Sequence, residues 1–525
     1  MEYVLALFDI RAKQKFIYRS NKIKEIVGGS MIIRDLFNDY LYNAAEETGV
    51  KGEQPLGKIK KYETGDVFSH EQFESDMKSG MYCGQVVYDG GGNLLVLFKN
   101  EEVCREAYKR FTRKVLKTIP TLNIVCTWQN VSSWDMYHRN YPEQGDYEKL
   151  YAAHRFAENQ ELLAEPYWTV PMAQVDYATS MPLTQHKMIV GKDTKLTSEQ
   201  YAKYEKYEKN VEGGFSESDR RISESIRLLD EMVEQKGKNS LLAIVYMDGN
   251  NIGMKYRGVL ESITSYDDCI NELRTKSNEL YEVFVEDTLD KVDEELNCKL
   301  LKQVGGKMNK VQRYVIYSGD EVNIILPAGL ALDYARTYLD KMNRNYHSCA
   351  GIAVFHSHAP FADAYRIAEK CCENAKTKGK EINPYKQENS LVDFHYCRAA
   401  IGVELKQIRE DEHLFNLSRP WFVNGIDENQ CPDVIKMNQV DQMARILNQY
   451  LGHSNIKGLI DSDIVSDERF EMEFHRILAH MSTSKKEALQ NEIGSDVYTY
   501  FRENRRLIRD IVEFYDIWFS GESET

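Results

Sequence analysis

The sequence lacks the cysteine spacing that marks a small zinc-binding or disulfide-linked domain. Its ten cysteines include no Cys-x-x-Cys pair. Zinc knuckles need closely spaced cysteines, and disulfide frameworks usually belong to short secreted chains. We therefore interpret the cysteines as free thiols, most of them buried.

Long hydrophobic runs are also missing. No apolar run approaches the roughly 18 residues that a membrane-spanning helix needs. The N-terminal stretch MEYVLALFDIRAKQ has a short apolar run with no basic region before it, unlike a signal peptide. These absences predict a cytoplasmic protein without a membrane anchor.

An excess of positive charge is the third absence. The formal net charge is −15, whereas a protein that binds nucleic acid over a whole face normally presents a basic surface. A local basic groove remains compatible with this charge. The 525 residues, 42% hydrophobic and 28% charged, predict a globular chain of about two to four domains.

The stretch Leu241 to Pro327 holds acidic residues at the ends of short apolar runs. LLAIVYMDGNNIG ends its run in Asp248, and RYVIYSGDEVNIILP has two runs joined at Ser318 and Gly319, followed by Asp320 and Glu321. Runs of this length and composition predict buried strands, and the glycine predicts a hairpin turn. If the hairpin lies beside the first strand, Asp248, Asp320 and Glu321 converge at one sheet edge.

Carboxylates gathered in this way would suit Mg²⁺ or Mn²⁺ held together with substrate phosphates. The alternative is that Asp320 and Glu321 only decorate a hairpin turn, where acidic residues are common. Neighbouring residues of a strand also face opposite sides of the sheet, so both need not reach one ion.

The chain has an internal repeat of architecture. Residues 1–155 and 240–395 both predict a strand with an aspartate at its end, helices, a glycine hairpin, a helix and a strand. In the first hairpin, Asp89-Gly90-Gly91-Gly92-Asn93, Asn93 stands near the place of Asp320. An amide is a poorer ligand for Mg²⁺ than a carboxylate. We therefore expect the first copy to be a nucleotide-binding or structural partner that does not hold the metals alone.

Two further segments complete the chain. Residues 156–238 are polar and predict a mobile or inserted segment, followed by a helix that leads into the second copy. Residues 396–525 carry apolar residues at helical spacing, and the aromatic face of the last helix is interpreted as core. The C-terminal GESET is expected to fray.

The motifs resemble those of Cas10, the large subunit of type III CRISPR complexes (Cmr2 and Csm1 types). FDIRAKQKFIYRSNKIKEIVGGS is similar to the opening of its first palm domain, and YDGGGNLLVLF resembles the first-palm hairpin. MDGNNIG, YSGDEVNIILP and CAGIAVFHSHAPFADAYRIAEKCCENAK resemble its second palm. The Gly-Gly-Asp-Asp hallmark is here Ser-Gly-Asp-Glu, which is closer to the GGDEF motif of diguanylate cyclases.

The resemblance implies an α+β fold with two ferredoxin-like palm (GGDEF/Cas10-type) domains and a C-terminal helical domain. The implied domains are a degenerate first palm at 1–155, a linker or helical insertion at 156–238, a second palm at 239–395 and a helical domain at 396–525. The HD nuclease domain and the cysteine-rich zinc element of many Cas10 proteins are absent from this pattern.

The resemblance also implies a nucleotidyltransferase that joins nucleoside triphosphates, ATP first among them, into a cyclic or linear oligonucleotide signal in antiviral defence. Asp248, Asp320 and Glu321 would hold two divalent ions, Mg²⁺ or Mn²⁺. The expected nucleotide contacts come from these residues: Ser318, Gly319, Lys376, Gly28, Gly29 and Ser30. RNA or CRISPR-type effector subunits are the other expected partners.

Two rival functions stay open. In the first, the palms form a non-catalytic scaffold that binds nucleotide or an RNA complex. Ser318 and Glu321, which replace a glycine and an aspartate of the Gly-Gly-Asp-Asp hallmark, permit this interpretation. In the second, the protein is a dinucleotide cyclase with a single cyclic product. Product analysis separates the two enzymes, and metal-dependent nucleotide binding separates either enzyme from a scaffold that binds no nucleotide.

Overall fold

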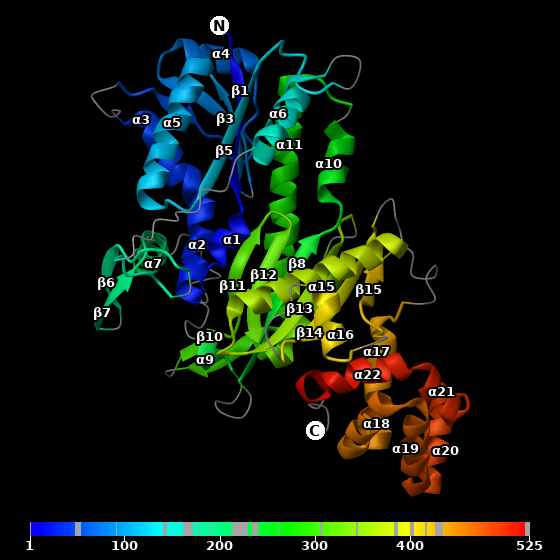
Figure 1. Cartoon of the computed structure of the whole chain (residues 1–525). Coiled ribbons are helices and arrows are strands. Elements are labelled where there is room, and N and C mark those ends of the chain that lie inside the picture. Colours follow the sequence, from blue (N-terminus) through cyan, green and yellow to red (C-terminus); the bar gives the residue numbers. More distant parts are fainter. Residues whose placement is uncertain are drawn as a thin grey trace. The chain divides into compact units, whose positions relative to one another are not determined.

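The chain divides into two compact units. The computed structural model describes residues 2–20, 22–47, 54–90, 92–139, 144–160, 172–177, 179–189, 191–212, 229–233, 240–260, 262–304, 307–342, 345–382, 387–398, 404–414, 417–425 and 434–519. Unit 1 comprises Met1–Ser223, Asn251–Glu286 and Val315–Asp320, and unit 2 comprises Glu224–Asn250, Asp287–Tyr314 and Glu321–Thr525. Each unit is therefore built from segments that lie far apart in the sequence (Figure 1).

Unit 1 is organised on a five-stranded sheet of order β2-β3-β4-β1-β5. Its elements are β1 (Val4–Arg11), α1 (Lys13–Ile17), α2 (Ile23–Leu36), η1 (Phe37–Tyr42), α3 (Asn43–Glu46), β2 (Lys58–Lys60), α4 (His70–Lys78), β3 (Tyr82–Gly90), β4 (Asn93–Phe98), α5 (Glu101–Thr118), β5 (Asn123–Asn130), α6 (Asp146–Gln160), β6 (Gln185–Ile189), β7 (Lys192–Leu196), α7 (Ser198–Glu212), α10 (Ile252–Leu260), α11 (Tyr266–Tyr281) and η3 (Glu282–Asp287).

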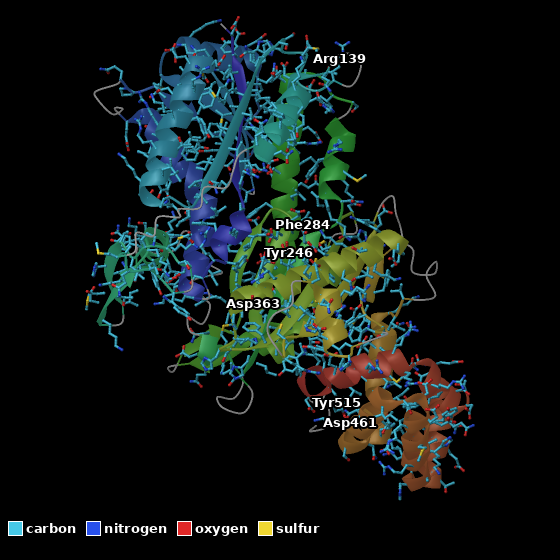
Figure 2. The ribbon with its side chains drawn as sticks, in the orientation of Figure 1. Arg139, Tyr246, Phe284, Asp363, Asp461 and Tyr515 are labelled. Carbon is cyan, nitrogen blue, oxygen red and sulfur yellow. The ribbon has the colours of Figure 1, made fainter. Side chains whose placement is uncertain are left out.

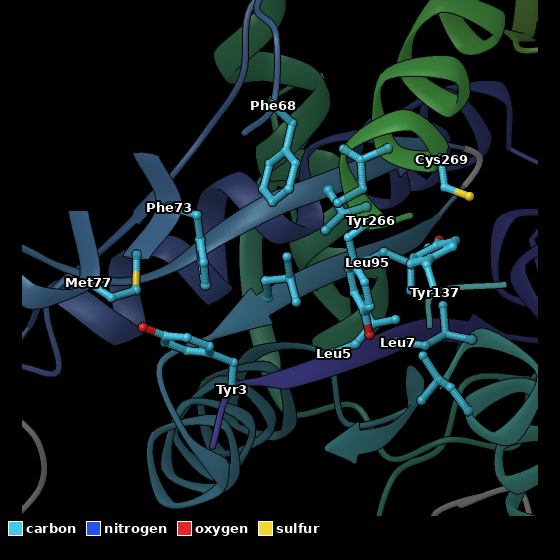
Figure 3. Packing of buried hydrophobic residues seen from close by; sticks show 14 residues of the cluster. Tyr3, Leu5, Leu7, Phe68, Phe73, Met77, Leu95, Tyr137, Tyr266 and Cys269 are labelled. Atoms are coloured by element: carbon cyan, nitrogen blue, oxygen red, sulfur yellow. The ribbon is translucent and has the colours of Figure 1, made fainter. Parts of the chain in front are cut away.

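Helix α11 belongs to unit 1 although it follows the first strand of the second repeat in sequence. Its Tyr266, Cys269 and Ile270 are buried with Leu5 and Leu7 of β1 in one apolar cluster (Figure 3). Arg274 of the same helix donates hydrogen bonds to the carbonyls of Val86 (2.7 Å) and Val87 (3.1 Å). This helix therefore completes the core on one face of the first sheet.

Unit 2 is organised on a six-stranded sheet of order β11-β12-β8-β13-β14-β15, although residues 315–318 of β11 are grouped with unit 1. The elements before its helical end are α9 (Leu229–Met232), β8 (Leu241–Gly249), α12 (Thr288–Glu295), α13 (Asn297–Leu300), β9 (Leu301–Val304), β10 (Lys307–Lys310), β11 (Arg313–Ser318), β12 (Glu321–Pro327), η4 (Ala328–Leu330), α14 (Ala331–Lys341), β13 (Ser348–His356), α15 (Phe361–Ile382), β14 (Asn389–Tyr396), α16 (Leu405–Asp411) and β15 (Trp421–Gly425).

The two sheets share one strand order. In the first sheet the hairpin β3-β4 lies on one side of β1 and β5 lies on the other, which gives β3-β4-β1-β5. In the second sheet the hairpin β11-β12 lies on one side of β8 and β13 lies on the other, which gives β11-β12-β8-β13. Strands β1 and β8 run antiparallel to both of their neighbours. The predicted internal repeat and the α+β class with two ferredoxin-like domains are confirmed.

Helix α15 covers one face of the second sheet and packs on β13, β14 and β8. The approach is closest at Gly351 of β13, where an added Cβ would lie 1.9 Å from the carbonyl oxygen of Ala368 and 2.4 Å from the amide nitrogen of Cys372. Only a residue without a side chain permits this contact, so Gly351 sets the depth at which α15 lies on the sheet.

The chain from Met437 to Phe519 is helical, as predicted, whereas residues 421–425 of the predicted helical part form strand β15 of the second sheet. It comprises α17 (Met437–Ile446), η5 (Leu447–Leu451), α18 (His453–Val465), α19 (Asp467–His480), α20 (Thr483–Ile493), α21 (Val497–Glu503), α22 (Arg505–Glu513) and η6 (Tyr515–Phe519). The aromatic face of the last segment packs on the sheet, because the rings of Phe514 and Trp518 lie 4.7 and 5.0 Å from that of Phe394 in β14. This confirms that the face is core.

The polar stretch after residue 156 forms regular structure where it is described. Strands β6 and β7 pair as a hairpin, and α7 packs on α2. Residues 213–228, which hold the end of the predicted mobile segment and the start of the predicted helix, and the GESET tail lie outside the described residues. The domain boundaries proposed from the sequence stay predictions. Within the described ranges, no helix combines the length and the apolar character needed to cross a bilayer.

Candidate functional site

Asp248 and Glu321 lie directly opposite each other in neighbouring strands. The antiparallel register of β8 and β12 pairs Asp248 with Glu321 and Tyr246 with Asn323. Directly paired residues present their side chains on the same face of a sheet, with Cβ atoms about 4.5–5.5 Å apart. The two carboxylates are therefore brought together, and the face they share is the one that α15 covers.

The turn before Glu321 consists of Gly319 and Asp320. Gly319 has a φ of +61°, and nothing lies within 4 Å of the position of an added Cβ. The glycine is thus required by backbone conformation rather than by crowding. Ser318 ends β11, and Asp320 lies in the turn outside the β8–β12 strand pair.

Glu321 is held in place by neighbouring polar groups. The side-chain amide of Asn323 donates a hydrogen bond of 2.7 Å to Oε1 of Glu321, and the Tyr365 hydroxyl lies 3.5 Å from the same oxygen. The Tyr365 ring meets that of Tyr246 edge to face at 5.7 Å (Figure 2 labels Tyr246). Burial, together with the nearby charges of Glu321 and Asp248, raises the pKa of Tyr246, so this phenol stays neutral.

Lys376 of α15 joins the two carboxylate-bearing strands to the helix. Its Nζ donates hydrogen bonds of 2.7 Å to Oδ2 of Asp248 and of 2.7 Å to the carbonyl oxygen of Gly249. Burial of the ammonium disfavours its charged form, but the charge and hydrogen bond of Asp248, together with the nearby Cys372 and Cys349, outweigh this and raise the pKa of Lys376. Helix α15 continues past Lys376 to Ile382, and the lysine points to the sheet.

The oxygen atoms around Lys376 are of the kinds that bind hard cations. A carboxylate oxygen and a main-chain carbonyl oxygen both lie 2.7 Å from its positive charge, and the paired Glu321 supplies a second carboxylate nearby. Oxygen donors of these two kinds are the ones that Mg²⁺ and Mn²⁺ prefer. The residues therefore fit a divalent ion, with Lys376 as the group that such an ion would displace from Asp248.

Gly28, Gly29 and Ser30 lie inside α2. A Cβ at Gly28 would lie 2.0 Å from the carbonyl oxygen of Lys203 in α7. The glycines thus allow close packing of two helices in unit 1. Their proposed contact with a nucleotide stays a prediction.

The first unit repeats the strand pairing with different residues. Asp9 of β1 is paired in register with Asn93 of β4, just as Asp248 is paired with Glu321. Asn93 therefore corresponds to Glu321, and not to Asp320 as the sequence suggested. The Lys13 ammonium lies 3.2 Å from the amide oxygen of Asn93 and 3.4 Å from Oδ1 of Asp9.

Sequence reasoning missed three groups near these aspartates. Asn323 and Tyr365 contact Glu321 in unit 2, and His154 of α6 approaches Asp9 in unit 1. Strand alternation could have placed Asn323 on the face of Glu321, two residues away. The positions of Tyr365 and His154 depend on how helices dock, which local sequence patterns do not report.

Comparison with known proteins shows a likeness of structure. No protein-family model and no curated protein matches the sequence. The crystal structure of a Csm1–Csm4 cassette in complex with pppApApA matches with a TM-score of 0.53 and 12% identity, over 98% of this chain and 69% of that one. An apo Csm1–Csm4 cassette matches at 0.43 and 13%, over 98% and 70%, and Csm1 in T. onnurineus at 0.40 and 12%, over 74% and 52%.

This chain spans only part of the length of the chains that it matches. This chain spans 54% of the matched chain in the complex with pppApA, and up to 70% in the apo cassette. At 12% identity, the match with a TM-score of 0.53 bears on the fold alone. Its coverage of nearly the whole chain agrees with the shared strand order of the two sheets and with the helical C-terminal part. The chain therefore has a Cas10/Csm1-type fold.

Proposed function

We propose that the protein is a metal-dependent nucleotidyltransferase that joins nucleoside triphosphates, ATP first among them, into a short oligonucleotide signal in antiviral defence. The observation that carries the proposal is the register pair of Asp248 and Glu321, with Lys376 bound to Asp248 on the same face. Two carboxylates at strand ends and one ammonium from α15 would form a site for a triphosphate and its cation.

Asp248 and Glu321 would hold Mg²⁺ or Mn²⁺, and Asp320 in the adjoining turn would contribute a further carboxylate. When bound, two such ions would make a ribose hydroxyl more acidic and neutralise charge on the α-phosphate and the leaving pyrophosphate. Asn323 and Tyr365 fix the orientation of Glu321, so this ligand would be positioned before substrate arrives.

Lys376 would act as the partner of the triphosphate. In the structure its ammonium is satisfied by Asp248 and by the Gly249 carbonyl. A cation bound to Asp248 would repel the lysine and release it toward phosphate oxygens, which it would meet as a point charge. Its raised pKa keeps it protonated at neutral pH, so it would stabilise charge and would not act as a base.

The turn at Gly319 would allow the substrate to approach closely. No atom lies within 4 Å of the position of its absent Cβ, so the space on this side of the turn is open to a ligand. The fold supports the same kind of ligand, because the Csm1–Csm4 cassette that matches with a TM-score of 0.53 is in complex with pppApApA. That compound has the form of a product of ATP joining.

A non-catalytic, nucleotide-binding scaffold subunit of a type III-like complex is the second candidate. It is favoured by the Lys376–Asp248 ion pair itself, which already neutralises the carboxylate that a metal would need. In this case RNA or other effector subunits would be the working partners, and a bound nucleotide would not be turned over.

Product analysis tests the proposal. The protein is incubated with α-labelled ATP and Mn²⁺, and both pyrophosphate release and labelled oligonucleotides are measured. The native protein and Asp333→Asn, an exposed carboxylate of α14 that is 46% accessible, should form product, whereas Asp248→Asn should form at least about 100-fold less. Binding of ATP without any pyrophosphate release, tested with RNA present and absent, would favour the scaffold.

A further inference from the structure

Three side chains of unit 1 gather around one point at the end of β1. They are Asp9 of β1 and His154 and Glu158 of α6, and one ligand atom from each lies within 4.8 Å of the others. The Nε2 atom of His154 lies 3.8 Å from Oδ2 of Asp9 and 3.9 Å from Oε1 of Glu158. Among the residues that the structure describes, this is the one such group of three or more His, Cys, Asp or Glu side chains.

His154 is buried and its other ring nitrogen has a partner. The side chain is 6% exposed, and the Thr127 hydroxyl of β5 lies 3.1 Å from Nδ1. When Nδ1–H donates to this hydroxyl, the lone pair of Nε2 points toward the two carboxylates. A hydrogen bond on the second nitrogen that orients the ring is typical of a metal-bound histidine.

The separations of the three groups are slightly wider than a shared ion would need. The distances of 3.8 and 3.9 Å from Nε2 to the carboxylate oxygens exceed the range of about 2.7–3.2 Å for N–H···O hydrogen bonds. Ligand atoms about 2.0–2.2 Å from a shared tetrahedral ion lie roughly 3.3–3.6 Å apart. A small movement of the side chains would therefore bring all three groups to one ion.

The neighbouring lysine leaves this position open. Lys13 approaches the other oxygen of Asp9, Oδ1, at 3.4 Å and also contacts Asn93. Oδ2 is the oxygen that faces His154. In unit 2 the corresponding residue is Asp248, and its Oδ2 accepts a hydrogen bond from Lys376. The two units therefore surround the corresponding aspartate with different groups.

We propose that Asp9, His154 and Glu158 bind a divalent transition-metal ion, with Zn²⁺ preferred over Mg²⁺. An imidazole nitrogen suits Zn²⁺, whereas Mg²⁺ prefers oxygen ligands alone. The ion would connect α6 to β1 in unit 1. His154 and Glu158 lie one helical turn apart, so α6 supplies two ligands from one face.

A titration with Co²⁺, a spectroscopic substitute for Zn²⁺, tests the site in the full chain. After treatment with a chelator, Co²⁺ is added in the presence of excess Mg²⁺ to occupy oxygen-only sites, and the visible absorption bands are followed. We expect one ion per chain, with bands that shift into the range of nitrogen-containing coordination. Asp248→Asn should bind this ion as tightly as the native chain.

Matched variants identify the ligands. His154→Ala and Glu158→Gln should each weaken Co²⁺ binding by at least about tenfold, whereas His186→Ala should not, because His186 is 60% exposed in a surface ion pair with Asp193. Glu158 is itself 36% exposed, so Glu158→Gln is expected to fold, which circular dichroism checks. No specific uptake of Co²⁺ or Zn²⁺ by the native chain, or equal uptake by Glu158→Gln and folded His154→Ala, would overturn the proposal.

Discussion

The Lys376 ammonium lies 2.7 Å from Oδ2 of Asp248 and ties α15 to the end of β8. Both side chains are mostly buried, with 21% and 29% of their surface exposed. The pair therefore contributes to stability, and its ammonium group lies beside the proposed metal ligands.

Replacing Lys376 by methionine should lower the free energy of unfolding by about 2 kcal/mol, because Asp248 loses a charged hydrogen-bond donor in a poorly hydrated place. Lys378→Met on the same helix should change it by less than about 0.5 kcal/mol, since Lys378 forms an ion pair with Glu381 at the surface. Urea denaturation measures both. Equal losses for the two variants would show that the Asp248 contact adds nothing.

Gly351→Ala should destabilise the protein by about 3 kcal/mol or more, because the new methyl group would meet the backbone of α15 at Ala368 and Cys372. Displacement of α15 should also weaken nucleotide binding through Lys376. The control is Gly253→Ala in α10, where nothing lies within 4 Å of the added carbon; it should be neutral or stabilising by up to about 1 kcal/mol. Denaturation and nucleotide titration check both effects.

Gly319→Ala separates the turn's conformation from its function. The φ of +61° should cost about 1–2 kcal/mol for alanine. Gly494→Ala at the end of α20, where φ is +70° and space is equally open, should cost a similar amount. Only Gly319→Ala should reduce nucleotide affinity, as measured by calorimetry. Unchanged affinity would remove the turn from the binding site.

His395 of β14 gives a prediction on pH. Burial lowers its pKa to about 2, with further contributions from the positive charges of Arg419, Arg409 and Arg398. The unfolded chain binds a proton near pH 6.5, whereas the folded chain does not. Stability is therefore fully present above pH 6.5 and falls as the pH decreases, by about 2 kcal/mol between pH 7 and 5 for this group.

Urea denaturation at both pH values checks this expectation. His395→Asn should lose about 2 kcal/mol less than the native protein over this interval, because it removes the group that titrates in the unfolded state. The control is His475→Asn, at an exposed position of α19, and it should retain the native dependence. An identical loss in the native protein and His395→Asn would contradict a depressed pKa.

The strands and hairpins of both units could be predicted from sequence. Short apolar runs with a glycine turn allow few alternatives, and the turn at Gly319 and Asp320 fixes the register of β11 and β12. The convergence of Asp248 with Glu321 followed from placing this hairpin beside β8, which the structure confirms. The assignment of Asn93 to the place of Asp320 was wrong by one residue, because β4 begins at Asn93 as β12 begins at Glu321, so Gly92 takes the place of Asp320.

Contacts made by docked helices could not be predicted in this way. The periodicity of α11 indicates an amphipathic helix, but not that it packs in unit 1 through Arg274 and the carbonyls of Val86 and Val87. Most lysines of a helix are solvated, whereas Lys376 contacts Asp248. The group of Asp9, His154 and Glu158 could not be predicted from sequence, because His154 and Glu158 come from a helix more than a hundred residues away from Asp9.

The most direct test of the central claim is a calorimetric titration of ATP in the presence of Mn²⁺, repeated without the metal. We expect the native chain and Asp333→Asn to bind ATP only when Mn²⁺ is present. Asp248→Asn and Glu321→Gln should each weaken binding by at least about tenfold, equivalent to about 1.4 kcal/mol. If folded native protein binds no nucleoside triphosphate, or if both variants bind ATP as tightly as Asp333→Asn, the paired carboxylates are not the nucleotide site.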